Sequence, residues 1–204
     1  MNTKQELMNF AAGIEHIGEG YESWGAVSVV RIAMRDGSEI LVTSAGATLS
    51  LLSDKDIVRL SDSAEDKLIG AVFAKRKKIN ALIITHQEYG SSIKEEIPPI
   101  LDDQAQLLGV SVRVADVSDA AKAISRTIAA LGSRYAAVCT DGRCICIGGT
   151  LDDSYIAAQL LEKTSKAWQE AKYLGGAKSI NRFEAWAMQM YYQFKYAKEA
   201  KKNR

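Results

Sequence analysis

His86 is the first residue whose type and position suggest chemistry. It closes the run "NALIITH" (residues 80–86), which is rich in strand-forming apolar residues. The end of a buried strand can present a side chain to a ligand crevice, and imidazole is a common metal ligand. His86 is therefore either a metal ligand or a polar group that lines a pocket. The alternative is a strand-end histidine that bonds to the backbone or to nearby Glu65.

The three cysteines are the other residues that could bind metal or carry redox chemistry. Cys139, Cys144 and Cys146 are clustered and odd in number, and no C-x-x-C pair is present. Cys144 and Cys146 are two apart in a predicted strand, so both side chains face the same side. We predict that they are reduced thiols that act as small core residues, and that no disulfide framework exists.

Composition limits the class of protein. A chain of 204 residues with 47% apolar residues can bury a full core as one domain. A formal net charge of +1 argues against nucleic acid as a partner. No run reaches the ~18 apolar residues of a membrane span, and no signal peptide follows Met1. We expect a cytoplasmic protein with no membrane partner.

Periodicity predicts alternating strands and helices. Helices are expected over 3–17, 63–75, 118–131, 150–174 and 179–202, with a short helical piece over 101–109. Strands are expected over 26–34, 38–43, 56–61, 79–85, 110–115, 135–139 and 144–149. Because strands occur both in hairpins and between helices, we predict an α/β fold. Its mixed, mostly antiparallel sheet would lie between helices in three layers.

Local signals set the expected element ends. Thr3 with Glu6 reads as a capping box, Ser118 as the cap of the helix that Gly132 ends, and Thr150 as the start of a long helix. The pair Asp36-Gly37 predicts a tight hairpin turn.

The two C-terminal helices carry apolar stripes at helical spacing. In the first, the stripe consists of Ile156, Leu160, Trp168 and Ala171. In the last, it consists of Ile180, Phe183, Ala187, Met190, Tyr191 and Phe194. We expect the last stripe to pack on the body or across a subunit interface. Trp186, Tyr192 and Tyr196 lie off this stripe, which makes an oligomer contact plausible.

Four segments, in order, resemble the class II aldolase/adducin family over nearly the whole chain, 1–204. "GAVSVVRI" corresponds to a strand opening of Gly-Asn-hydroxyl type, and "ILVTSAG" to a "LITPSG" turn. "SAEDKLIGAVFAKRKKINALIITHQEYGSS" follows an "SSE…AVVHTHSPY" segment, and "AAVCTDGRCICIGGTLDD" follows a "NHG…GxTL" segment. The resemblance implies the family's fold, and a tendency to form a homo-oligomer, commonly a tetramer.

The resemblance also implies a catalytic divalent metal, usually zinc, held by three histidines. Those three positions fall on Ile84, His86 and Asp141, so one histidine of three is present. The chain has only two histidines, and we expect the other, His16, at the surface of the first helix. A three-histidine site cannot be built, because the Ile84 side chain has no lone pair.

The family's acid/base glutamate and phosphate pocket can be carried over in the same way. The resemblance places the catalytic carboxylate at Glu65 and retained ligand-binding groups at Ser28, Gly46 and Ser63. Ala26 and Ala45 replace hydrogen-bonding residues of the pocket. Each lost charge-assisted bond would cost about 1.5–3 kcal/mol of ligand affinity.

Two functions are open at this point. The first is a divergent, non-catalytic member that binds a small polar or sugar-like ligand or a partner, with no cofactor. The second is a sugar-phosphate aldolase or epimerase, a carbon–carbon lyase of carbohydrate metabolism. It would use Glu65 as acid/base and would hold an altered divalent metal, such as manganese, iron or magnesium, with His86 and Asp141.

Overall fold

A seven-stranded sheet with the order β3-β2-β1-β4-β7-β6-β5 forms the centre of the protein. The structure is a computed structural model and describes residues 2–17 and 24–202. Five of the six strand pairs are antiparallel, and only β5 and β6 run parallel. The strands are β1 (Val27–Asp36), β2 (Glu39–Thr43), β3 (Ile57–Arg59), β4 (Ala81–Gln87), β5 (Arg113–Ala115), β6 (Ala136–Cys139) and β7 (Cys144–Gly148).

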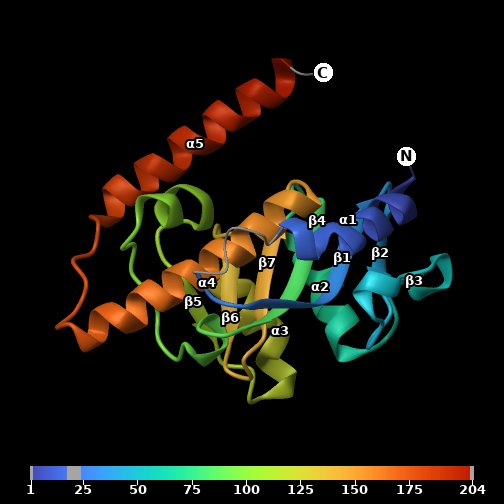
Figure 1. The fold of residues 1–204 in the computed structure, drawn as a ribbon, viewed down its shortest axis with the longest axis horizontal. Helices are drawn as coiled ribbons and strands as arrows, with labels where there is room; N and C mark the ends of the chain where they lie inside the picture. Colours follow the sequence, from blue (N-terminus) through green and yellow to red (C-terminus); the bar gives the residue numbers. More distant parts are fainter. Residues whose placement is uncertain (1, 18–23, 203–204) are drawn as a thin grey trace.

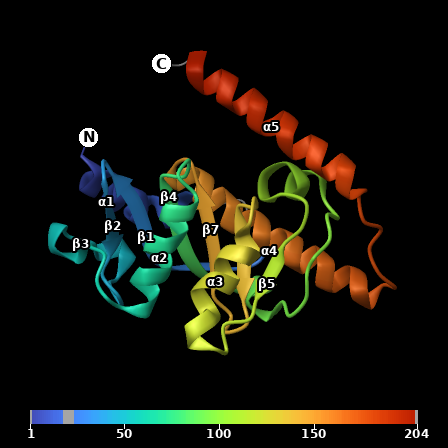
Figure 2. The same cartoon turned by 180° about the vertical axis from the view of Figure 1, so that it is seen from behind.

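Helices cover both faces of this sheet (Figures 1 and 2). The helices are α1 (Thr3–Ile17), α2 (Ala64–Lys75), α3 (Ala120–Leu131), α4 (Leu151–Tyr173) and α5 (Arg182–Lys202). Side chains of α1 and α4 share one core with one face of the sheet, and side chains of α2 and α3 share a second core with the other face. The predicted fold, a mixed and mostly antiparallel sheet between helical layers, is confirmed. None of the described helices combines the length and apolar character needed to cross a membrane.

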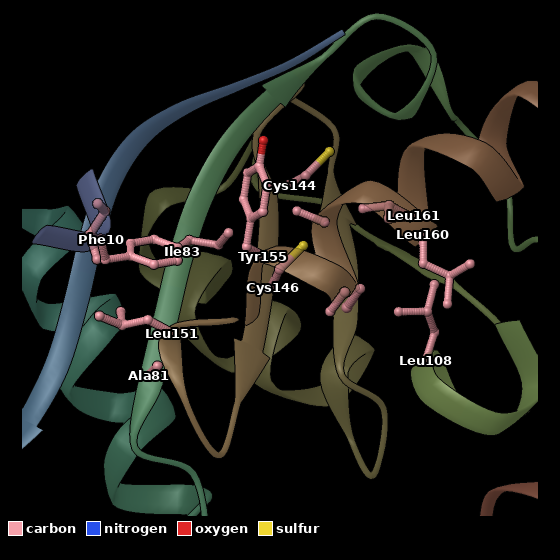
Figure 3. Close-up of a cluster of buried hydrophobic side chains, with 14 of the residues drawn as sticks. Phe10, Ala81, Ile83, Leu108, Cys144, Cys146, Leu151, Tyr155, Leu160 and Leu161 are labelled. Atoms are coloured by element: carbon pink, nitrogen blue, oxygen red, sulfur yellow. The ribbon is translucent and has the colours of Figure 1, made fainter. Parts of the chain in front are cut away.

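Strand β4 is central because its side chains are apolar on both faces. Ile83 packs into the α1/α4 core near Phe10 and Tyr155 (Figure 3). Leu82 and Ile84 point the other way, into the α2/α3 core. All four side chains of Ala81–Ile84 are fully buried, as expected for a strand covered on both sides.

The three cysteines are core residues, as predicted. All three thiols are free and buried. Cys144 and Cys146 lie in the α1/α4 core (Figure 3), whereas Cys139 faces the α2/α3 core. Burial raises the pKa of each thiol, that of Cys144 to about 12. These residues therefore contribute packing and not nucleophilic chemistry.

Two predicted helix caps are wrong by one residue. At α1, the Asn2 side chain accepts a hydrogen bond from the Gln5 backbone N–H, while the Thr3 hydroxyl donates to Asp36. At α3, the cap is Asp119, whose carboxylate accepts from the Ala121 N–H. In both cases a side chain with a stronger or better-placed acceptor lies next to the predicted residue. The cap at Thr150 is confirmed and forms a capping box with Asp153.

The predicted apolar stripe of α4 is partly wrong, and for the stripe of α5 only packing across a subunit interface stays open as a prediction. On α4, Leu160 is buried but Ile156 is 44% exposed. Helix α5 extends away from the sheet (Figure 1), and its main contact with the body is a π-helical turn at Gln104–Leu108. Its large apolar residues Phe183 and Phe194 are exposed, and among its side chains up to residue 195, those that it buries are Ala185 and Gln189. The stripe of α5 therefore does not pack on the body.

Candidate functional site

The candidate site lies at the end of β4, on the face covered by α2. Ile84 is fully buried there, and His86, two residues on, is exposed at the strand end. Side chains two apart in a strand face the same side, so both belong to this face. In the antiparallel register, Ser28 of β1 lies opposite His86. Ser28 and His86 are thus neighbours at the rim of the sheet.

Arg31 is the cross-strand partner of Ile84. The register places Arg31 of β1 directly opposite Ile84, after an irregularity in β1 between Val29 and Arg31. Its guanidinium is 5% exposed and reaches the first turn of α2. Nη1 donates to Glu65 Oε1 at 2.9 Å, and Nη2 donates to Asp66 Oδ1 at 2.6 Å. A buried cation therefore lies beside the aliphatic residue that stands at a predicted histidine position.

Arg143 approaches Glu65 from the other side. It follows the β6–β7 turn, and its Nε and Nη2 atoms lie 2.9 and 2.8 Å from Asp141 Oδ2. Its Nη1 atom lies 3.5 Å from Glu65 Oε2. Each carboxylate oxygen of Glu65 is therefore paired with a different arginine. Two guanidiniums and three carboxylates, those of Glu65, Asp66 and Asp141, form one connected cluster.

The charges in this cluster are mutually stabilised. Burial alone would raise the pKa of Asp66, but hydrogen bonds from Ser61 and the charge of Arg31 outweigh it and hold the pKa below its ordinary value. Burial would also raise the pKa of Asp141, but the hydrogen bonds and the charge of Arg143 outweigh burial and lower that pKa. For Arg143, the effect of burial is outweighed by Asp141 and Glu65, so its pKa is raised.

Local structure explains why Glu65 lies where it does. The Ser63 hydroxyl accepts from the Asp66 N–H and caps α2, so Ser63 is confirmed as the residue that begins this helix. Asp66 also accepts from the Ser61 backbone and hydroxyl, at 2.8 and 2.6 Å. These bonds fix the first turn of α2, from which the Glu65 side chain contacts Arg31 of β1.

The structure joins some of the predicted site residues and not others. Glu65 and Asp141 are linked through Arg143, and Ser28 lies opposite His86. Gly46 lies in the exposed loop after β2, with a φ of +74°. Across residues 2–17 and 24–202, no hydrogen bond or ion pair connects His86 or Gly46 to the Glu65 cluster. The side chain of His16 lies outside the described residues.

The residues present do not fit a three-histidine metal site. Within the described part of the chain, no three His, Cys, Asp or Glu side chains converge closely enough to hold a metal ion. Ile84 offers no lone pair, and the oxygens of Glu65 and Asp141 that face the site are held by Arg143. The positive charge in this site comes from arginine side chains.

Sequence reasoning missed both arginines. A signal for Arg31 was present, since it is the one charged residue in the run "AVSVVRIAM". A charged residue inside a buried strand needs a partner, so its presence predicts nearby carboxylates. Arg143 follows Asp141 by two residues in a turn, and only the fold brings it to Glu65.

The fold and site together describe an α/β protein of the class II aldolase type, with a cluster of arginines and carboxylates at the strand ends. Residues 5–169 match the family described as "Class II Aldolase and Adducin N-terminal domain". The chain belongs to this family. Helix α5 lies beyond the matched residues.

Named relatives agree with this assignment. The chain is 24% identical over 147 residues to an L-fuculose phosphate aldolase of Methanocaldococcus jannaschii, covering 66% of this chain and 81% of that protein. A solved L-fuculose 1-phosphate aldolase superposes with a TM-score of 0.79 at 17% identity, over 93% of this chain and 95% of the other. YgbL of Escherichia coli, described as a putative aldolase/epimerase/decarboxylase, gives 0.69 at 15% identity, over 91% and 97%. These structures support the fold.

Proposed function

We propose that this protein is a divergent class II aldolase/adducin member without the three-histidine zinc site. It would act as an oligomeric protein that binds a small polar or sugar-like ligand or a partner, and not as a zinc lyase. The observation that carries this proposal is the pairing of Glu65 with both Arg31 and Arg143, next to Ile84. Residues 1–204 would form one domain of this family, working in the cytoplasm.

The ion pairs argue against Glu65 as a general acid or base. Such a group must reach within hydrogen-bond distance of the proton it transfers. Here Oε1 is 2.9 Å from Arg31 and Oε2 is 3.5 Å from Arg143. Moving Glu65 to a substrate would leave the largely buried Arg31 with fewer partners, which is costly in a site shielded from water.

The charge balance indicates the ligand class. The cluster has three carboxylates against two guanidiniums, so it carries no excess positive charge to attract a phosphate. Exposed Ser28, Ser63 and His86 offer neutral hydrogen-bonding groups at its rim. We therefore expect an unphosphorylated polyol or sugar to bind more tightly than its phosphate ester.

Metal analysis of the purified protein tests the proposal. We expect substoichiometric zinc, manganese and iron after purification in metal-replete medium, and unchanged thermal stability after treatment with a chelator. A tightly bound metal at one per chain, whose removal abolishes an activity, would overturn the proposal. Arg143→Gln is a useful second variant, because it frees Glu65 and Asp141 from one cation and should increase metal uptake.

The second candidate is a carbon–carbon lyase of sugar phosphates with an altered divalent metal. The observation in its favour is that Glu65 and Asp141 meet in one cluster. Metal-stimulated turnover of an aldol-donor panel, lost in Glu65→Gln, would support this candidate and contradict the first.

We also propose that the protein forms a homo-oligomer, and a tetramer in particular. Support comes from the apolar residues that α5 exposes, since exposed apolar patches of this kind mark association surfaces.

A further inference from the structure

A second charge cluster lies where α5 meets the body. It contains Arg113 of β5, Arg134 before β6 and Arg182 at the start of α5, around the single carboxylate of Glu96. The three arginine–glutamate distances are 3.4, 4.0 and 3.7 Å. All are longer than the ~2.7–2.9 Å of a good charge-assisted hydrogen bond. One carboxylate thus faces three guanidiniums, which leaves an excess of two positive charges.

Arg134 is the most buried of the three arginines, so the excess positive charge affects it most. Its side chain is 5% exposed, and its Nε atom donates to the Ser111 hydroxyl at 2.9 Å. Burial lowers the pKa of Arg134, and the charges of Arg113 and Arg182 lower it further, against the opposing effect of Glu96. One carboxylate against three guanidiniums leaves the cluster with a net positive charge.

A buried hydrogen-bond donor without an acceptor lies near the aliphatic part of the Arg134 side chain. Gln189 of α5 is 4% exposed, and its Nε2 atom has no hydrogen-bond acceptor among the described residues. Gln189 and Arg134 both border Gly109, where a Cβ atom would lie 2.9 Å from Gln189 Nε2 and 3.4 Å from Arg134 Cγ. Arg113 Nε is also buried and makes no hydrogen bond, although it lies 3.4 Å from Glu96 Oε2 in an ion pair. Buried donors of this kind normally have a partner, which can be a ligand.

We propose that Arg113, Arg134, Arg182 and Gln189 bind a phosphate group, either free phosphate or a phosphate monoester. Guanidinium forks match phosphate oxygens, and a dianion would neutralise the two excess charges. Arg182 and Gln189 come from α5, whereas Arg113 and Arg134 come from the body. Bound phosphate would therefore fasten α5 to the sheet. This site is separate from the Glu65 cluster and does not depend on the function proposed for that cluster.

Phosphate titration by calorimetry and thermal unfolding tests this site. We expect one saturable phosphate per chain and a rise in melting temperature that chloride at equal ionic strength does not reproduce. Arg113→Gln and Arg182→Gln, both at partly exposed positions, should each weaken phosphate binding about tenfold or more, the loss of one charge-assisted bond. Arg59→Gln on β3 is the matched control, because Arg59 is an exposed arginine that also pairs with one glutamate. It should bind phosphate like the wild type.

Proteolysis reports on α5 directly. Phosphate should slow chymotryptic cleavage at Phe183 and Phe194 in the wild type and not in Arg182→Gln. A titration with methyl phosphate separates the two ligand sources, since tighter binding of the ester than of free phosphate would assign the site to monoesters. Equal effects of phosphate and chloride, or wild-type phosphate affinity in both variants, would overturn the proposal.

Discussion

Arg31 is the residue on which the candidate site depends. Its guanidinium is buried in the sheet and must be paired, because an isolated buried charge is very unfavourable. Asp66 supplies that pairing at 2.6 Å and is itself held by Ser61. Glu65 adds a second contact and so is drawn toward the sheet. The buried Arg31 therefore acts together with the Ser63 cap of α2 to position Glu65.

Removing the charge of Asp66 should destabilise the fold strongly. In Asp66→Asn, Arg31 loses its closest buried partner, so we expect a loss of about 3 kcal/mol or more in the free energy of unfolding, measured by urea denaturation. Asp62→Asn is the control, since Asp62 is fully exposed and lies 3.7 Å from Lys67. Its loss should stay below about 0.5 kcal/mol. Equal losses in the two variants would contradict this account of Arg31.

The Arg31–Asp66 ion pair also predicts that the stability of the fold decreases at acidic pH. The folded state holds the Asp66 proton less tightly than the unfolded state does, because its pKa lies below the ordinary 3.8. The contribution of Asp66 is therefore complete above that value and is lost as the pH falls through the folded-state pKa. The stability difference between the wild type and Asp66→Asn should be constant from pH 5 to 7 and should shrink below about pH 4. A difference that grows on acidification would be incompatible with this pairing.

The buried thiols should be unreactive in the folded protein. Cys139, Cys144 and Cys146 are fully buried, and the pKa of Cys144 is raised to about 12. Native protein at pH 8 should therefore show almost no reaction with a thiol-specific disulfide reagent, and all three thiols should react in denaturant. Rapid labelling of one thiol in the native state would show that the core opens locally.

At the residue scale, the sequence predicted the loss of metal-binding histidines, but it did not predict the cluster of arginines and carboxylates. Motif spacing places the family's three histidine positions at Ile84, His86 and Asp141, which stays a prediction, and the lack of a third histidine follows from counting. The role of Arg143 could not be predicted, because its contact with Glu65 joins residues 78 positions apart in the chain. Such a contact depends on strand order, which periodicity does not determine.

At the scale of elements, the connection from β7 to α4 is a close-packed turn next to the core. A Cβ atom on Gly148 would lie 2.5 Å from the Ser154 backbone N and 2.8 Å from the Thr150 backbone O. Backbone atoms in a capped first turn cannot move aside easily. The glycine pair "GG" therefore allows α4 to begin directly against the sheet.

Adjacent glycines provide a test of this packing. Gly148→Ala should reduce the free energy of unfolding by about 1–3 kcal/mol, because the new methyl group overlaps backbone. In Gly149→Ala the nearest atom is a side-chain oxygen of Asp153 at 3.2 Å, so the loss should be much smaller. Chemical denaturation of both variants measures the contrast. A larger loss at Gly149 would contradict it.

Whether a segment forms a helix or a strand was easier to predict than which of its side chains are buried. Apolar runs and the Asp36-Gly37 turn correctly indicated β1, β2 and β4. The stripe on α4 failed at Ile156, because helical spacing identifies an apolar face without identifying what covers it. The two misplaced caps show a related limit, since neighbouring polar residues compete for the same backbone N–H group.

At the scale of the whole molecule, α5 is the helix whose large apolar side chains remain uncovered in a single chain. Phe183, Tyr191 and Phe194 are more than 70% exposed on a helix with one main contact to the body. The family match ends at residue 169, before this helix. The sequence suggested an oligomer contact through Trp186, Tyr192 and Tyr196; Trp186 is 48% exposed, Tyr192 is half-buried, and the side chain of Tyr196 lies outside the described residues.

Light scattering coupled to gel filtration tests association through α5. We expect the wild type to elute as an oligomer, and a double variant, Phe183→Ser with Phe194→Ser, to dissociate at concentrations at least tenfold higher. Tyr173→Ser is the control, because Tyr173 is 91% exposed at the end of α4 and lies off α5. A wild-type monomer at high concentration would contradict this proposal.

The two outer strands, β3 and β5, are only three residues long. Each carries an arginine on its exposed margin, and Val112 beside β5 is already bridged to Ile97. Short, charged margins offer few unpaired backbone groups for another strand to join. These margins therefore disfavour aggregation of the folded protein by strand addition.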